Sequence, residues 1–466
     1  MAISRLKPKI MAIGDSLPQG CRSLTVKASY CAQSWPARIA AEQGWAFVSP
    51  DHPWEVLFDL EREIRRLDPV LFSPATLALI GLPQRIKDNL QLWLGPTARS
   101  KNQSFDNLAV AGSEVHDLYN RTSASYGGEI LKLTKGDLQE QIDNLADLHV
   151  AINGKYVLNP QQIPEFDDFS PLDWVEARQP ETLLVQSGHN HGLFMIGFQG
   201  KASSITGGND PQGRDFFQQW EVVAERIANL PDTVKRIVVV LLPKVGAVAA
   251  LLPTSDASVD GYAESYVARL LPTSRKLAGN HIADADREIQ AVNQQIRNIF
   301  QKASAATNTA NRLHFIDTFS MLNEFDYKNY LSPDMRIKIS DSMSIDNCYL
   351  DGMLDFSSPQ LSRLKAGGYL SIDGMHPSGV GYADLASKVM AELNLSHNRA
   401  RLLETAFQED TLLSNYPLEL DAITRYIDLL RPLNAANRFV AESANRLRDN
   451  THLSQALKLL SKPFVK

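Results

Sequence analysis

Four short apolar runs, rich in β-branched residues, constrain the fold of this chain more than any other feature. They cover residues 10–13, 182–185, 237–242 and 313–316, and a weaker fifth run covers residues 107–110. Runs that are apolar on both faces are typical of central strands in a parallel sheet. This pattern predicts an α/β fold, with a mostly parallel five-stranded sheet between two layers of helices. Helical spacing separates the runs, for example at Phe216, Trp220, Val223 and Ile227.

Three stretches exceed the length that a parallel crossover needs, namely residues 46–104, 114–180 and 319–371. We interpret them as insertions on a main domain of residues 1–396. Loops at the carboxyl ends of parallel strands usually form the ligand site, so the insertions either determine substrate choice or pack at the periphery. Residues 397–466 have helical spacing and predict a C-terminal α-helical appendage. That appendage packs on the main domain, contacts a second copy of the chain in a homo-oligomer, or covers the site.

The charge balance and the apolar stretches narrow the choice of partners. The 466 residues include 47 Lys and Arg and 53 Asp and Glu, which gives a net charge of −6 without a long block of one sign. Such a chain offers nucleic acid no electrostatic footprint, so we expect no nucleic-acid partner. The most apolar stretch, residues 237–252, is interrupted by Pro243, Lys244 and Gly246. It is also shorter than the ~20 residues that span a bilayer, so we expect no transmembrane segment.

The first residues and the cysteines bear on the compartment. No signal-like apolar segment precedes the first run, which predicts a cytoplasmic protein, although a secreted chain whose leader was removed would begin in the same way. Three cysteines do not make a disulfide framework, but Cys21 and Cys31 could pair in an oxidising compartment.

Residues suited to nucleophilic catalysis stand at three predicted strand ends and just before a helix expected at residues 379–393. They are Gly-Asp-Ser-Leu at 14–17, Ala-Gly at 111–112, Gly-His-Asn-His at 188–191 and Asp-Gly-Met-His at 373–376. A serine hydroxyl is a poor nucleophile until an adjacent base removes its proton, and a third group must orient that base. These residue types therefore predict a serine hydrolase.

In this order, the four segments resemble the SGNH or GDSL hydrolase superfamily, whose motifs follow one another on successive strand ends. The resemblance implies a three-layer α/β/α sandwich of the flavodoxin-like type, with Ser16 as nucleophile, His376 as base and Asp373 as the residue that orients the base. It also implies an oxyanion hole made by the backbone N–H groups of Ser16 and Gly112 and the side-chain amide of Asn190. A tetrahedral intermediate needs two or three such donors. No cofactor or metal is required.

Two residues depart from the family pattern. His191 stands where the family has an aspartate, and Pro18 stands where Ser or Thr is common. His189 and His191 are also spaced to share a metal ion. Because the sequence shows no third ligand for them, we expect no metal site.

The predicted reaction is cleavage of a carboxylic ester of a small acyl or lipid-like molecule. The apolar runs at 71–82, 90–94 and 246–252 either line an acyl groove or belong to the core, and no substrate-binding residue is assigned. Three alternatives stay open: a carbohydrate acetylesterase or thioesterase of the same family, a transacylase, and a non-catalytic binding or scaffold protein that retains the fold. If His376 is the base, activity should rise with pH near the ~6.5 of an unperturbed imidazole.

Overall fold

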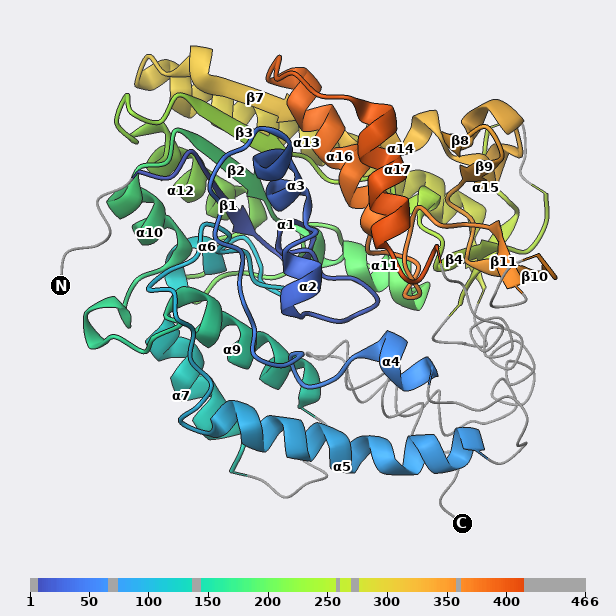
Figure 1. Cartoon of the computed structure of the whole chain (residues 1–466). Coiled ribbons are helices and arrows are strands. Elements are labelled where there is room, and N and C mark those ends of the chain that lie inside the picture. Colours follow the sequence, from blue (N-terminus) through green and yellow to red (C-terminus); the bar gives the residue numbers. More distant parts are fainter. Residues whose placement is uncertain are drawn as a thin grey trace.

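A four-stranded parallel sheet lies at the centre of the fold (Figure 1). The computed structural model describes residues 7–65, 74–135, 144–256, 260–269, 276–357 and 362–414. The first three strands along the chain are almost completely buried, as the sequence predicted, whereas the last, at 313–316, is half-buried except at Ile316; together they make the chain a mixed α/β protein. In spatial order they are β1 (Ile10–Gly14), β2 (Thr182–Gln186), β3 (Arg236–Val240) and β7 (Leu313–Ile316).

The fifth predicted strand, residues 107–110, is not one of the regular strands of the sheet. This segment runs beside β1 and makes one isolated parallel bridge, between Ala12 and Asn107. Three backbone hydrogen bonds join it to β1: the Ala12 N–H donates to the Asp106 carbonyl at 2.9 Å, and the N–H groups of Leu108 and Val110 donate to the carbonyls of Ala12 and Gly14 at 2.8 and 2.9 Å. The Asn107 side chain also accepts a hydrogen bond from the Ala109 N–H at 3.2 Å and donates one to the Pro18 carbonyl at 2.7 Å. The segment is thus paired with the edge of the sheet without being a regular fifth strand, and residues 111–113 lie at the carboxyl end of β1.

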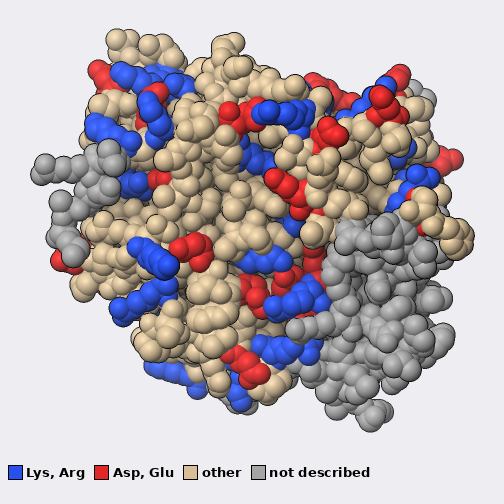
Figure 2. Space-filling view, viewed as in Figure 1, with Lys and Arg blue, Asp and Glu red and all other residues tan. Residues whose placement is uncertain are grey.

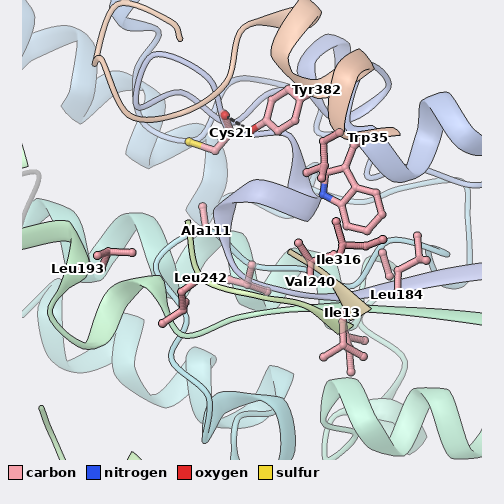
Figure 3. Packing of buried hydrophobic residues seen from close by; sticks show 14 of the residues in the cluster. Ile13, Cys21, Trp35, Ala111, Leu184, Leu193, Val240, Leu242, Ile316 and Tyr382 are labelled. Carbon is pink, nitrogen blue, oxygen red and sulfur yellow. Dashed lines mark hydrogen bonds between the residues drawn. The ribbon is translucent and has the colours of Figure 1, made fainter. Parts of the chain in front are cut away.

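Two pairs of helices pack on the sheet. Helices α3 (Trp35–Glu42) and α16 (Gly379–Glu392) pack against each other, and they contact β1 and β7 respectively (Figure 1). Helices α12 (Phe216–Ala228) and α13 (Gly279–Ala306) form the second pair, and α13 contacts β7. Their apolar stripes match the predicted helical spacing. In Figure 3, the buried side chains of Leu184, Val240 and Ile316 lie on the same side of the strands as Trp35 of α3, and Ile13 lies on the opposite side.

The three predicted insertions contain secondary structure of their own. The first holds α4 (Leu60–Arg65) and α5 (Pro74–Leu94). The second holds α6 (Asp117–Asn120), α7 (Ser123–Leu133), α9 (Leu145–Leu158), η1 (Pro164–Phe166) and α10 (Pro171–Arg178). The third holds the end of α14 (Thr318–Glu324), α15 (Tyr327–Tyr330), η5 (Pro333–Met335) and two hairpins, formed by β8 (Ile337–Ser340) with β9 (Met343–Ile345) and by β10 (Asp351–Leu354) with β11 (Ser362–Ala366).

Short elements complete the described chain. They are α1 (Ser16–Gln19), α2 (Ala28–Cys31), η2 (His189–His191), α11 (Leu193–Gln199), η3 (Val245–Ala247), η4 (Ala310–Arg312) and a small antiparallel sheet of β4 (Leu251–Pro253), β5 (Ser265–Ala268) and β6 (Leu277–Ala278).

The apolar runs proposed for an acyl groove divide between core and surface. Residues 246–251 are buried. In α5, Leu90 and Trp93 are buried, whereas Leu92 and Leu94 are 44% and 50% exposed. The side chains at 71–82 lie outside the described residues. Most of the described positions in these runs thus belong to the core.

The predicted C-terminal appendage is described only at its start. Helix α17 (Arg399–Glu409) packs on α16, and residues 415–466 lie outside the described part of the chain. Among the described helices, none is long and apolar enough to cross a membrane. On the face drawn in Figure 2, acidic and basic side chains lie interspersed.

Candidate active site

The turn after β1 presents Ser16. Gly14 ends the strand at φ +145°, and a Cβ at this position would lie 1.8 Å from the Gln186 carbonyl oxygen, so the close approach of β2 requires glycine. The Asp15 side chain accepts a hydrogen bond from the Leu17 N–H and caps α1. Ser16 is the first residue of that helix and is 8% exposed. Its hydroxyl therefore stands at the carboxyl edge of the sheet, where parallel α/β folds build their sites.

The segment before α16 brings the predicted base to this hydroxyl. His376 Nε2 lies 2.9 Å from Ser16 Oγ, and His376 Nδ1 lies 2.8 Å from Asp373 Oδ2. Gly374 makes the tight turn between the two residues at φ +71°, where a Cβ would lie 2.6 Å from the Ala250 nitrogen. All three predicted catalytic residues thus meet in a serine, histidine and carboxylate arrangement.

The environment keeps Asp373 ionised. Burial raises the pKa of this carboxyl, but the His376 imidazole and the N–H groups of Met375 and His376 outweigh burial and bring the pKa below its usual value. Those two N–H groups donate to Asp373 Oδ1 at 2.8 Å, and the Leu24 N–H donates to Oδ2 at 2.7 Å. An ionised Asp373 favours the tautomer of neutral His376 that carries its proton on Nδ1, which leaves Nε2 free to accept the Ser16 proton.

The pKa of His376 is raised well above its ordinary value. Burial lowers it, but the neighbouring Cys21 sulfur and the Asp373 carboxylate raise it by more. A more basic imidazole is a stronger proton acceptor, although a larger fraction of it is protonated at neutral pH. The direction of this shift moves the pH at which the base becomes active upward from 6.5.

Two backbone donors of the predicted oxyanion hole have no protein acceptor. Within the described residues, the N–H groups of Ser16 and Gly112 make no hydrogen bond. Gly112 adopts φ +91°, and a Cβ there would lie 2.3 Å from Val150 Cγ2, so the site needs glycine for its backbone conformation and for the close packing of α9. Unpaired N–H groups beside a nucleophile are the donors that a developing oxyanion requires.

The third predicted donor, Asn190, is half-buried and comes from η2 after β2. One hydrogen of its Nδ2 is used, because this atom donates to the Ser113 carbonyl at 2.7 Å. A side-chain amide has two N–H hydrogens, so one remains for a substrate oxygen. The same contact ties η2 to the turn that carries Gly112.

His191 replaces the aspartate of the family pattern and acts as a brace. Its Nε2 accepts a hydrogen bond from the Val115 N–H at 3.2 Å, and its Nδ1 donates to the Gly207 carbonyl at 2.9 Å. Burial lowers its pKa to about 4, so it is neutral at physiological pH. With both ring nitrogens engaged, it has no atom left for a metal. Among the described residues, no group of three or more His, Cys, Asp or Glu is placed to hold a metal ion.

Several contacts at the site were not foreseen from the sequence. Cys21 was considered only as a partner for Cys31, yet both are free thiols and Cys21 neighbours the His376 ring. His189 Nδ1 lies 2.6 Å from Asp15 Oδ2, which forms a second histidine–carboxylate pair beside the nucleophile. The Leu24 N–H reaches Asp373 from a turn in which Ser23 and Leu24 both adopt φ +53°. No residue pattern signals these contacts, because each joins segments that are remote in sequence or in uncommon backbone conformations.

Comparisons with protein-family models, with curated proteins and with solved structures found no match for this chain. Its function is therefore inferred from the residues of the site and their geometry.

Proposed function

We propose that this chain is a serine hydrolase of the SGNH or GDSL type that cleaves a carboxylic ester through an acyl-Ser16 intermediate. The observation that carries the proposal is the continuous chain of hydrogen bonds from Ser16 Oγ through His376 to Asp373, at 2.9 and 2.8 Å. The described sheet has four strands, whereas the fold of that family was expected to have five. The three-layer α/β/α arrangement of the family is therefore part of the proposal.

The first half-reaction follows from this geometry. His376 Nε2 accepts the proton of Ser16 as the serine oxygen attacks the acyl carbonyl carbon. The N–H groups of Ser16 and Gly112, with Asn190, stabilise the negative oxygen of the tetrahedral intermediate. His376 then donates its proton to the alcohol oxygen as the ester bond breaks, and the acyl group remains on Ser16.

The second half-reaction repeats these steps with water. His376 accepts a proton from a water molecule, which attacks the acyl carbon, and then returns the proton to Ser16 Oγ as the carboxylic acid leaves. Ionised Asp373 stabilises the imidazolium that forms in both halves.

Apolar groups on both sides of the catalytic residues support an acyl substrate. Val150 lies against Gly112, and Met375 precedes His376; both side chains are half-buried. The Met375 sulfur lies 3.4 Å from the position that a Cβ on Gly197 would occupy, so helix α11 continues the apolar wall. Apolar surface beside the nucleophile favours an acyl or lipid-like group over the acetyl group of the carbohydrate alternative, and it does not distinguish an ester from a thioester.

The non-catalytic alternative predicts that Ser16 and His376 lie apart. Their hydrogen bond favours the hydrolase instead.

A fluorophosphonate probe tests the proposal directly, because it phosphonylates only a serine that a base has activated. We expect intact mass and peptide mapping to place the label on Ser16, and Ser16→Ala and His376→Asn to abolish it. Ser187→Ala is the matched control: this buried hydroxyl follows β2 and has no hydrogen-bond partner in the described chain, so labelling should persist. Absence of label on folded wild-type protein would contradict the proposal.

A series of p-nitrophenyl esters with acyl chains from two to twelve carbons then defines the substrate class. We expect kcat/KM to increase with acyl length beyond acetate. A maximum at acetate would favour the carbohydrate acetylesterase alternative, and turnover that depends on an added alcohol would favour the transacylase.

A further inference from the structure

A buried pair of side-chain amides joins the nucleophile helix to the turn that carries Gly112. Gln19, the last residue of α1, donates from Nε2 to Asn153 Oδ1 at 2.8 Å, and Asn153 Nδ2 donates back to Gln19 Oε1 at 2.8 Å. Both side chains are completely buried. Asn153 lies on α9, inside the insertion at 114–180. Two amides buried this deeply are costly unless each polar atom is paired, so their presence requires a physical reason.

The amide pair ends at the oxyanion turn. Gln19 Oε1 also accepts a hydrogen bond from the Ala111 N–H at 2.7 Å. The carbonyl of the same peptide unit, that of Val110, accepts from the Ser113 N–H at 3.0 Å. The peptide immediately before the one that carries the Gly112 N–H is therefore held at both ends.

Ser113, the residue after Gly112, is also anchored. Ser113 Oγ donates to the Gly14 carbonyl at 3.0 Å, and the Ser113 carbonyl accepts from Asn190. The Gly112 N–H lies between the held Val110–Ala111 peptide and the anchored Ser113, and it has no acceptor in the described chain. Its direction is thus determined by its neighbours, among which Gln19 alone lies on the helix that begins with Ser16.

The far end of the network is also satisfied. Asn153 Oδ1 lies 3.0 Å from His52 Nε2, and burial lowers the pKa of His52 to about 4, so this ring is neutral. The donor Ala111 N–H fixes which end of the Gln19 amide is oxygen, and that choice fixes Asn153 in turn. Every polar atom of the amide pair has a partner, which favours one rigid arrangement.

We propose that Gln19 and Asn153 are positioning residues that hold the Gly112 N–H in register with the Ser16 hydroxyl. The inference rests on the proposed hydrolase function and extends it: through Asn153, the insertion at 114–180 completes the oxyanion hole. Oxyanion donors act only when they are pre-positioned to within about 0.5 Å, so loosening this link weakens binding of the transition state more than binding of the substrate.

The test compares Gln19→Met with Gln19→Glu and with Gln219→Met. Methionine is close in size to glutamine but cannot accept from Ala111, whereas glutamate keeps an acceptor oxygen. Gln219 is an equally buried glutamine on α12, and its amide contacts the Arg214 carbonyl instead of the site. For each variant, kcat, KM and the affinity for a trifluoromethyl ketone are measured, because this inhibitor forms a hemiketal oxyanion on an active serine.

For Gln19→Met we expect kcat and trifluoromethyl ketone affinity to fall together by about 10- to 100-fold, with KM within threefold of wild type. Gln19→Glu should recover most of kcat, and Gln219→Met should match the wild type. Asn153→Leu, and the double variant that combines it with Gln19→Met, should each resemble Gln19→Met alone. The effects of substituting two residues that act as a unit do not add. If Gln19→Met does not fold, Asn153→Leu decides the test by the same readouts.

Unchanged kcat in a folded Gln19→Met or Asn153→Leu protein would overturn the inference while leaving the hydrolase intact. An equal loss in Gln219→Met would also overturn it, because the effect would then be one of general stability. Absence of Ser16-dependent turnover in the wild type would instead reject the proposed function, and this inference with it.

Discussion

The two halves of the proposed catalytic triad, Ser16 on one side and His376 with Asp373 on the other, are held in place by different means. The turn with Ser16 is fixed by backbone bonds at the sheet edge, where the Asp15 N–H donates to the Gln186 carbonyl and the Val110 N–H donates to the Gly14 carbonyl. The segment with His376 lies outside the sheet, and its carboxylate is held by the Leu24 N–H and by its own backbone turn. A nucleophile at a strand end inherits its position from the sheet, whereas the base depends on loops that meet only in the folded chain.

The largest test of this comparison uses the two histidine–carboxylate pairs that flank the serine. His376→Asn removes the only base on Ser16 Oγ among the described residues, and we expect kcat to fall on the order of 10⁴-fold or more. His189→Asn keeps a donor toward Asp15 and contacts no reacting atom, so we expect about a tenfold loss or less. Steady-state kinetics on a p-nitrophenyl ester measures both. Equal losses of kcat in the two variants would show that the His376–Asp373 and His189–Asp15 pairs do not differ in role.

The second test concerns the turn at Ser23 and Leu24, whose Leu24 N–H holds the carboxylate beside His376. Arg22, a buried guanidinium, immediately precedes this turn. Arg22 Nη1 donates to Asp410 Oδ2 at 3.0 Å, and its Nε lies 3.6 Å from Glu61 Oε1. Arg22→Met leaves two buried carboxylates without their cation, and we expect a loss of about 3–5 kcal/mol in the free energy of unfolding.

Urea denaturation measures this loss, and Arg401→Met is the matched control. Arg401 forms an exposed pair with Glu42, so its removal should cost ~1 kcal/mol or less. Similar losses in the free energy of unfolding for the two variants would mean that Arg22 and its two carboxylates do not anchor the segment beside Asp373 and His376.

The oxyanion donor on the sheet side gives the next effect. Asn190→Ala removes one donor and releases the Ser113 carbonyl, and we expect kcat to fall about 10²–10³-fold with a smaller change in KM. Asn190→Asp is a useful companion, because it retains the size of the side chain but replaces the donor with a negative charge. A loss of less than threefold in Asn190→Ala would remove Asn190 from the oxyanion hole.

The pH dependence of kcat/KM tests the proposed role of His376 as the base. Because the pKa of His376 is raised, kcat/KM should increase with pH through a midpoint above 6.5, with about a tenfold loss per pH unit below it. Asp373→Asn should move the midpoint down, since the carboxylate no longer favours the imidazolium. His191→Asn should leave it unchanged, because the pKa of His191 is lowered to about 4. A flat profile from pH 5 to 8 would contradict a histidine base.

Prediction from the sequence succeeded where local pattern controls structure. The four central strands, α12, α13 and α16 followed from the spacing of apolar residues, because burial of one face or of both faces depends on that spacing. Ser16, Asp373 and His376 were each assigned from a short motif, and the structure places His376 within hydrogen-bond distance of both Ser16 and Asp373.

Prediction failed where a single side chain or a distant contact decides. The segment at 107–110 hydrogen-bonds to β1 without being a regular strand, and the bonds of the Asn107 side chain to Ala109 and Pro18 are contacts that apolar spacing does not reveal. The sequence also did not reveal that His189 Nδ1 pairs with Asp15, or that Val115 and Gly207 engage the two ring nitrogens of His191.

The sequence by itself determined the positions of four strands along the chain, the residues at their carboxyl ends and the glycines at turns that exclude a side chain. These depend on residue type and local backbone geometry. Only the tertiary structure decided that Leu24 would bind Asp373, that Cys21 would neighbour His376 and that Asn153 on an inserted helix would pair with Gln19. Such contacts join residues far apart in the chain, and their distances depend on how all the elements pack at once, which no local pattern encodes.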